Sequence, residues 1–128
     1  MSTDAVMLTM TVNGGIELDA LGGAIQRVAP DDTAFAPRNA RFLCFYEANW
    51  QRQDGPEAAA DNQHWLRDLQ KALRPYVSGA SYVNFVDPDR GDFLQAYYGH
   101  NLARLQAVKK AYDADDFFHF EQSIPLPP

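Results

Sequence analysis

Hydrophobic and polar residues alternate at the start of the chain, and this spacing predicts β-strands. Apolar side chains recur at every second position from Val6 to Val12 and again from Ile16 to Ala20. Side chains of a strand point alternately to its two faces, so each segment predicts a strand with one buried face. Asn13-Gly14-Gly15 separates the two segments, and Asn and Gly accept positive φ. Residues 5–20 are therefore expected to form a β-hairpin.

Three later segments also have the pattern of strands. Apolar residues occupy both faces at the start of residues 41–50, which predicts an inner strand covered on both sides there. Residues 24–28 are expected to resume the first strand after a glycine pair breaks it. Residues 81–86 are expected to form a strand on which Tyr82 and Asn84 share one face.

Apolar residues at helical spacing predict two main helices. The first is expected to begin with Asp61 as its cap and to stop at Pro75, because proline pushes the preceding residue out of the α region. Residues 93–98 predict a short helix. The second main helix is expected to follow Asn101, which can cap it, and to continue to Tyr112.

The order of these elements predicts an α+β fold, in which an antiparallel β-sheet carries the two main helices packed on one face. The length of 128 residues fits a single domain, residues 1–128, with a core of its own. Residues 117–128 are aromatic and then Pro-rich, so we expect them to lie extended against the body of the domain.

Charge and composition exclude several classes of protein. The formal charge of −6, with only Lys109-Lys110 as a local basic pair, argues against nucleic-acid binding. No apolar run approaches the ~20 residues of a membrane span, and the first residues lack the positive region of a secretory signal. The single cysteine, Cys44, can form no internal disulfide and is expected to be a buried small hydrophobe. These features favour a cytoplasmic protein.

No metal site is expected. The histidines His64, His100 and His119 lack the spacing of metal ligands. The acidic segment Asp87–Asp92 resembles a calcium loop, but its fifth place is Gly and Tyr98 stands where that loop needs Glu. We interpret this segment as a polar turn. Glycine fingerprints of phosphate or dinucleotide binding are also missing from the sequence.

Tyr82 and Asn84 are the candidate ligand-binding residues. A Tyr and an Asn on one strand face form a poor core, because both carry groups that must be hydrogen-bonded when buried. A flat ligand could satisfy them, since the amide supplies donors and an acceptor and the phenol can act as either. Neighbouring loops or water could satisfy them as well, and the residues alone leave both interpretations open.

A spaced motif covers the second half of the chain. It consists of Tyr82-x-Asn84, an acidic turn, Tyr98-Gly99-x-Asn101, Arg104-Leu105, Val108-Lys109, Tyr112-Asp113, Phe118 and Gln122-Ser123-Ile124-Pro125. This segment closely resembles the C-terminal segment of the berberine-bridge-enzyme-like FAD-linked oxidases. Upstream, Leu21 to Phe42 resembles the substrate domain of the same enzymes, so the resemblance covers nearly all of the chain.

The resemblance implies FAD as cofactor. In members of the family the N-terminal half of the protein holds the FAD, and this chain does not contain that half. It implies that the matching segment roofs the isoalloxazine and shapes the substrate pocket. Tyr82, Asn84 and Gln122 are then the expected cofactor contacts, with the segment near Gln122 supporting the other two. In several family members a Tyr directly after the Asn is the catalytic base. Phe85 occupies that place here, so either the base lies elsewhere, with Tyr82 as the candidate, or the chemistry differs, or no catalysis occurs.

Two functions are consistent with this resemblance. In the first, the chain is the substrate-side segment of a FAD-dependent oxidoreductase, is not catalytic alone, and works on a small-molecule substrate beside a separate FAD-binding polypeptide. In the second, it is a stand-alone, non-catalytic domain that binds a small molecule or another protein. A sheet face without its usual cover exposes an apolar patch. We therefore expect a homodimer or a hetero-partner in contact with residues 41–50 and 82–86.

Overall fold

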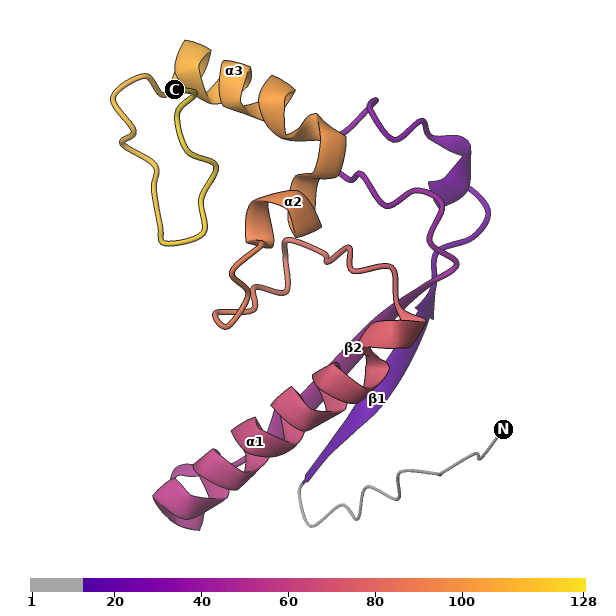
Figure 1. The fold of residues 1–128 in the computed structure, drawn as a ribbon, viewed down its shortest axis with the longest axis vertical. Coiled ribbons are helices and arrows are strands. Elements are labelled where there is room, and N and C mark those ends of the chain that lie inside the picture. Colours follow the sequence, from indigo (N-terminus) through magenta and orange to yellow (C-terminus); the bar gives the residue numbers. More distant parts are fainter. Residues whose placement is uncertain (1–12) are drawn as a thin grey trace. The chain divides into compact units, whose positions relative to one another are not determined.

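The computed structural model describes residues 13–128, which divide into two compact units. The first unit includes residues 13–19 and 42–76, and the second combines residues 20–41 with residues 77–128. The predicted hairpin strand before residue 13 lies outside the described residues. Figure 1 shows the elements of each unit along the chain.

A small sheet and a long helix make up the first unit. Strands β1 (Asn13–Ala20) and β2 (Phe42–Asn49) pair in a two-stranded antiparallel sheet, and helix α1 (Gly55–Leu73) packs against β2 (Figure 1). With helix α3 (Leu102–Tyr112) of the second unit, this arrangement confirms the predicted α+β class with an antiparallel sheet and two main helices.

The predicted hairpin turn at Asn13-Gly14-Gly15 is wrong, because these residues begin strand β1. Gly14 lies where β1 runs close to the main chain of β2. A Cβ on Gly14 would overlap the carbonyl oxygen of Glu47 and approach the Cα of Ala48 to 2.9 Å. The glycine is therefore needed for close strand pairing and not for a turn.

Strand β2 confirms the strand predicted for residues 41–50. Within the described chain it pairs with β1 alone, so the expectation of an inner strand is not met there. None of its residues is buried, and Phe42 at its start is 54% exposed. Cys44 is half-buried, and this burial raises the pKa of its thiol.

Helix α1 begins earlier than its apolar spacing predicts. The main-chain N–H of Gln51 donates to the Asp54 carboxylate at 2.7 Å, in a capping box that leads into the helix at Gly55. The helix ends at Leu73, and Pro75 lies in the 3₁₀ turn that follows, as predicted. Within residues 13–128 no helix is long and apolar enough to cross a bilayer.

The core of the second unit gathers around helix α2 (Phe93–Tyr98). Three successive residues of this helix are buried: Ala96, Tyr97 and Tyr98. Half-buried apolar side chains from the later part of the unit pack against them: Val83, Phe93, Leu94, Leu102, Leu105 and Ile124. Sequence-distant segments of this unit therefore share one small core.

Side chains hold the loop before β2 in an irregular course. The predicted strand at residues 24–28 is wrong, because Ile25–Arg27 forms a 3₁₀ turn. The Arg38 guanidinium donates to the Ile25 carbonyl at 3.3 Å, and the Gln26 amide donates to the Ala40 carbonyl at 3.2 Å. These bonds close the loop on itself.

Asn101 directly precedes α3, as predicted, but its side chain does not cap the helix. The side-chain N–H₂ of Asn101 instead donates to the carbonyls of Pro30 at 2.8 Å and Thr33 at 3.1 Å. The amide thus fastens the upstream loop to the start of α3. After α3 the chain contains no helix or strand, but it is not simply extended, because turns closed by the Asp116 N–H on the Asp113 carbonyl and the Ser123 N–H on the Phe120 carbonyl fold it into a loop (Figure 1).

Candidate functional site

Tyr82 and Asn84 lie in a tight turn. The N–H of Phe85 donates to the carbonyl of Tyr82 at 2.9 Å and closes this turn. The N–H of Ser81, just before it, donates to the carbonyl of Ala96 in α2 at 2.9 Å. The predicted strand over residues 81–86 is therefore wrong, because these main-chain groups bond within the turn and to a helix.

The turn brings the two predicted side chains into direct contact. The amide Nδ2 of Asn84 donates to the phenol oxygen of Tyr82 at 2.8 Å. Tyr82 is half-buried and Asn84 is exposed, and residues 13–128 offer no further recorded hydrogen bond to either side chain. The two polar groups thus satisfy each other in part and are not consumed by main chain from neighbouring loops.

Aromatic neighbours fix the ring of Tyr82. Phe35 lies 5.5 Å away between centroids at an interplanar angle of 87°, and Phe85 lies 5.7 Å away at 68°. Both contacts are edge-to-face arrangements, which aromatic rings prefer. The ring of Tyr82 is consequently held between two aromatic rings, and its phenol oxygen accepts from the Asn84 amide.

This arrangement fits the polar edge of a planar heteroaromatic group. Because Asn84 donates to the phenol oxygen, the phenol keeps its own proton to donate, and the Asn84 amide oxygen keeps its acceptor capacity. A half-buried phenol and an exposed amide, with one donor and one acceptor to spare beside two aromatic rings, are complementary to the polar edge of a flavin or its substrate. The residues present therefore fit FAD as a neighbour.

A closed ring of hydrogen bonds lies where the turn ends. The N–H of Asp87 donates to the Tyr97 phenol at 3.1 Å, the phenol donates to Oε1 of Gln122 at 2.9 Å, and Nε2 of Gln122 donates to the Asp87 carbonyl at 2.8 Å. Tyr97 is 2% exposed and Gln122 is 5% exposed. The oxygen and the nitrogen of the Gln122 amide both form hydrogen bonds within the unit. The contact between Gln122 and a cofactor that the sequence led us to expect stays a prediction.

Arg90 closes the loop on the other side of the turn. Its guanidinium donates to the Ser81 hydroxyl at 2.8 Å and to the Gly79 carbonyl, and it pairs with Asp92 at 2.9 Å. The segment interpreted as a polar turn is thus organised by an arginine. Among the described residues no group of three or more His, Cys, Asp or Glu is placed to hold a metal.

Sequence patterns did not reveal the roles of Tyr97 and Arg90. Tyr97 fits the apolar side of a short helix, so its spacing predicts packing, and its hydroxyl function depends on Gln122, 25 residues away. Arg90 stands in a run of charges typical of a solvated turn. A signal was present only for Gln122, which belongs to the motif shared with the FAD-linked oxidases.

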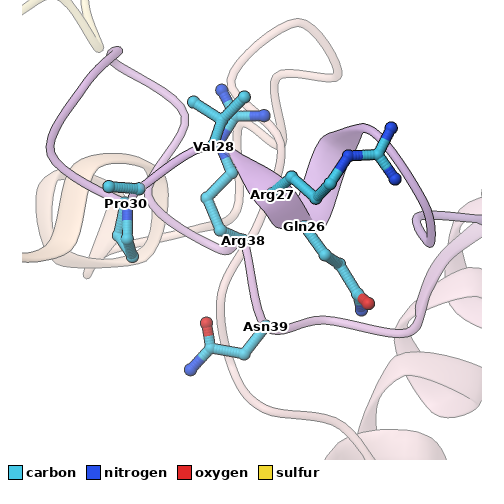
Figure 2. A pocket seen from close by; sticks show the side chains of 7 residues that line it. Gln26, Arg27, Val28, Pro30, Arg38 and Asn39 are labelled. Carbon is cyan, nitrogen blue, oxygen red and sulfur yellow. The ribbon is translucent and has the colours of Figure 1, made fainter.

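A hollow of about 460 Å³ lies elsewhere in the second unit, beside the loop before β2 (Figure 2). Its lining consists of Gln26, Arg27, Val28, Ala29, Pro30, Arg38 and Asn39. Figure 2 shows the side chains of Gln26, Arg27 and Asn39 spreading apart. A ligand site needs polar groups that converge, so this hollow is not the candidate site.

The turn and its hydrogen-bonded frame lie within a segment that known proteins share. Residues 81–125 match the family described as "Berberine and berberine like". The "Uncharacterized FAD-linked oxidoreductase YgaK" of Bacillus subtilis (strain 168) is 41% identical over 113 residues, which are 88% of this chain and 24% of that protein. The "Carbohydrate oxidase" of Microdochium nivale is 34% identical over 115 residues, which are 84% of this chain and 23% of that protein.

Solved structures agree with these sequence matches. Wild-type BBE-like 1 of Physcomitrella patens superposes with a TM-score of 0.81 at 35% identity, over 91% of this chain and 24% of that chain. A chitooligosaccharide oxidase superposes with a TM-score of 0.79 at 26% identity, over 94% of this chain and 27% of that chain.

The sequence matches and the solved structures point to one family. The resemblance found in the sequence is confirmed: this chain carries the berberine-like segment of the berberine-bridge-enzyme-like family. It spans about a quarter of the length of the curated relatives that it matches.

Proposed function

We propose that this chain is the substrate-side segment of a FAD-dependent oxidoreductase and is not catalytic alone. The matched relatives are named FAD-linked oxidoreductases or oxidases, and the match covers most of this chain but only about a quarter of theirs. The observation that carries the proposal is the Tyr82–Asn84 pair, which lies partly exposed on a turn inside the family segment.

The proposed chemistry divides between cofactor and chain. When bound, FAD supplies the redox chemistry by accepting a hydride from a substrate carbon that bears oxygen or nitrogen. Oxidation of such a carbon also releases a proton from its oxygen or nitrogen, and Tyr82 is the proposed base that takes this proton. Asn84 holds the phenol oxygen in place through its amide donor. Phe85, the next residue, has no proton to exchange.

Exposed apolar side chains support a partner. In the first unit Ile16, Leu18 and Trp50 are 51%, 62% and 41% exposed, and in the second unit Val86 is 49% exposed. Large exposed apolar patches usually mark interfaces, and these side chains are the candidates for such a patch within each unit. We include in the proposal a homodimer or a separate FAD-binding polypeptide as partner; sedimentation of a clean monomer at micromolar concentration would remove the homodimer.

A cytoplasmic location belongs to the same proposal. Its support is the composition of the chain, with one half-buried cysteine and no disulfide partner in the sequence. Proteins of oxidising compartments more often pair their cysteines. Imaging of the tagged full-length protein in its own cells tests this point, and an extracellular signal would overturn it.

A segment exchange tests the proposed function. The matched segment of the Microdochium nivale carbohydrate oxidase is replaced by this chain, and the same oxidase without any segment serves as control. The exchanged protein is expected to purify with the visible absorption of oxidised flavin and to consume oxygen with carbohydrate. This chain alone is expected to show no turnover with or without added FAD. A colourless exchanged protein, or turnover by the chain alone, contradicts the proposal.

A further inference from the structure

Main-chain anchors flank the turn that carries Tyr82 and Asn84. Before the turn, Ser81 is fixed by its N–H bond to the Ala96 carbonyl and by the Arg90 guanidinium on its hydroxyl. After the turn, Asp87 is fixed at both its N–H and its carbonyl. Because both anchors lead back to helix α2, the turn has little freedom to move relative to that helix.

The anchor after the turn is the more demanding of the two. It consists of buried polar groups, the Tyr97 phenol and the Gln122 amide, and each of the three bonds in the ring involves at least one of them. A buried polar group that loses its partner is strongly unfavourable, so the ring is expected to be fully formed or fully broken. Apolar residues would fill the same space without this constraint.

We propose that Tyr97 and Gln122 are positioning residues for the Tyr82–Asn84 pair. By gripping both polar groups of Asp87, three residues after Asn84, they set the path of the main chain that leaves the turn. A functional pair has to be held within about half an ångström of its working geometry, and residues with locked side chains provide this. The catalytic meaning of the role rests on the proposed function, but the positioning itself does not.

The same ring ties the end of the chain to the site. Gln122 belongs to the irregular tail after α3, and it reaches Asp87 across 35 residues of sequence. Gln122 is therefore a polar residue with a structural role in the tail. It completes, together with Tyr97 of α2, the hydrogen bonds that hold the main chain after the turn. Gln122 supports the pair from behind and need not contact the cofactor.

Nuclear magnetic resonance on the 128-residue chain tests the proposal without any cofactor. Tyr97→Phe and Gln122→Met each break the ring, and Tyr112→Phe and Gln95→Met are matched controls at exposed positions. Both ring variants are expected to shift the signals of the Asn84 side-chain amide and the Tyr82 ring. They should also speed solvent exchange of that amide about fivefold, because the loss of about one hydrogen bond corresponds to a factor of that size. Unchanged signals in a folded ring variant would overturn the proposal.

Gln122→Glu provides a second measurement in an isosteric side chain. A protonated Glu can donate to the Asp87 carbonyl and accept from Tyr97, whereas an ionised Glu can only accept. In this variant the Asn84 and Tyr82 signals are expected to match those of wild type at pH 4 and to be displaced from them at pH 8. Wild type is measured at both pH values, so that shifts from other titrating groups can be subtracted. Signals that match wild type at both pH values would refute the positioning role. Absence of flavin activity in the segment exchange would leave this result intact.

Discussion

Replacement of Asn101 by Asp removes the donor of two buried hydrogen bonds with almost no change in the shape of the side chain. Asn101 is 5% exposed, and its N–H₂ donates to the carbonyls of Pro30 at 2.8 Å and Thr33 at 3.1 Å. An aspartate in the same position directs a carboxylate oxygen at those two carbonyl oxygens. Two attractive contacts thereby become two repulsive ones.

The expected loss of stability follows from these contacts. Each neutral hydrogen bond contributes about 1 kcal/mol, so Asn101→Ala should cost about 2 kcal/mol. Asn101→Asp should cost more, about 3 kcal/mol, because a charge that loses its partners on burial adds a desolvation penalty. For a chain of this length, with a total of about 0.1 kcal/mol per residue, this is a large fraction of the stability.

Urea unfolding followed by circular dichroism measures this loss, and amide exchange of residues 30–33 locates it. Tryptophan fluorescence is unsuitable, because Trp50 and Trp65 both belong to the first unit. Asn39→Asp, the same change at an exposed position of the second unit, is the control and should stay within about 0.5 kcal/mol of wild type. If Asn101→Asp is equally mild, the two carbonyl bonds are not formed in solution and the reasoning fails.

Three further predictions concern other parts of the chain. Gly14→Ala should lower the stability of the first unit by about 1–3 kcal/mol, because its Cβ collides with β2. Gly15→Ala, whose Cβ meets nothing within 4 Å, should leave that stability unchanged. Unfolding followed by tryptophan fluorescence measures both, and equal free energies of unfolding would contradict the close approach of the strands. Lys109 pairs with Asp113 at 2.5 Å and Asp116 at 2.6 Å, and these hydrogen bonds raise the pKa of Lys109, while the bond from Lys109 lowers the pKa of Asp113. The Phe117 and Phe118 amides donate to Asp113, so their protection from hydrogen exchange should be full between pH 3.8 and pH 10.5, the ordinary pKa values of Asp and Lys. Protection should decline as the pH falls through the lowered pKa of Asp113 or rises through the raised pKa of Lys109. It should be lost in Lys109→Met but not in Lys110→Met. Cys44, whose pKa burial raises, should react with a thiol reagent more slowly in the folded chain than in urea, and equal rates would show that it is not shielded.

Long periodic segments were predictable from the sequence because they depend on neighbours a few residues away. The strand at residues 42–49 and the helix ending before Pro75 follow from such local patterns. The turn predicted at Asn13-Gly14-Gly15 failed for the opposite reason. Gly14 is required by the main chain of Glu47, more than thirty positions further on, and a local turn signal cannot reveal that.

The candidate site was predictable only in part. Tyr82 and Asn84 were expected on one face of a strand, and they do meet, but through a turn of four residues. Alternation over so short a segment cannot distinguish these structures. The partners that decide between them are the Ala96 carbonyl, which α2 supplies, and the Tyr97–Gln122 ring, which exists only once the tail has packed against α2.

The most direct test of the account is the turnover of the segment-exchanged carbohydrate oxidase with Tyr82→Phe, normalised to bound flavin. Retained flavin shows that the variant is folded, so a change in turnover reports on the phenol itself. We predict a kcat about 10²-fold lower than with Tyr82, the usual contribution of a positioned general base. Equal turnover with full flavin content would contradict the claim that this turn presents a working group to the substrate.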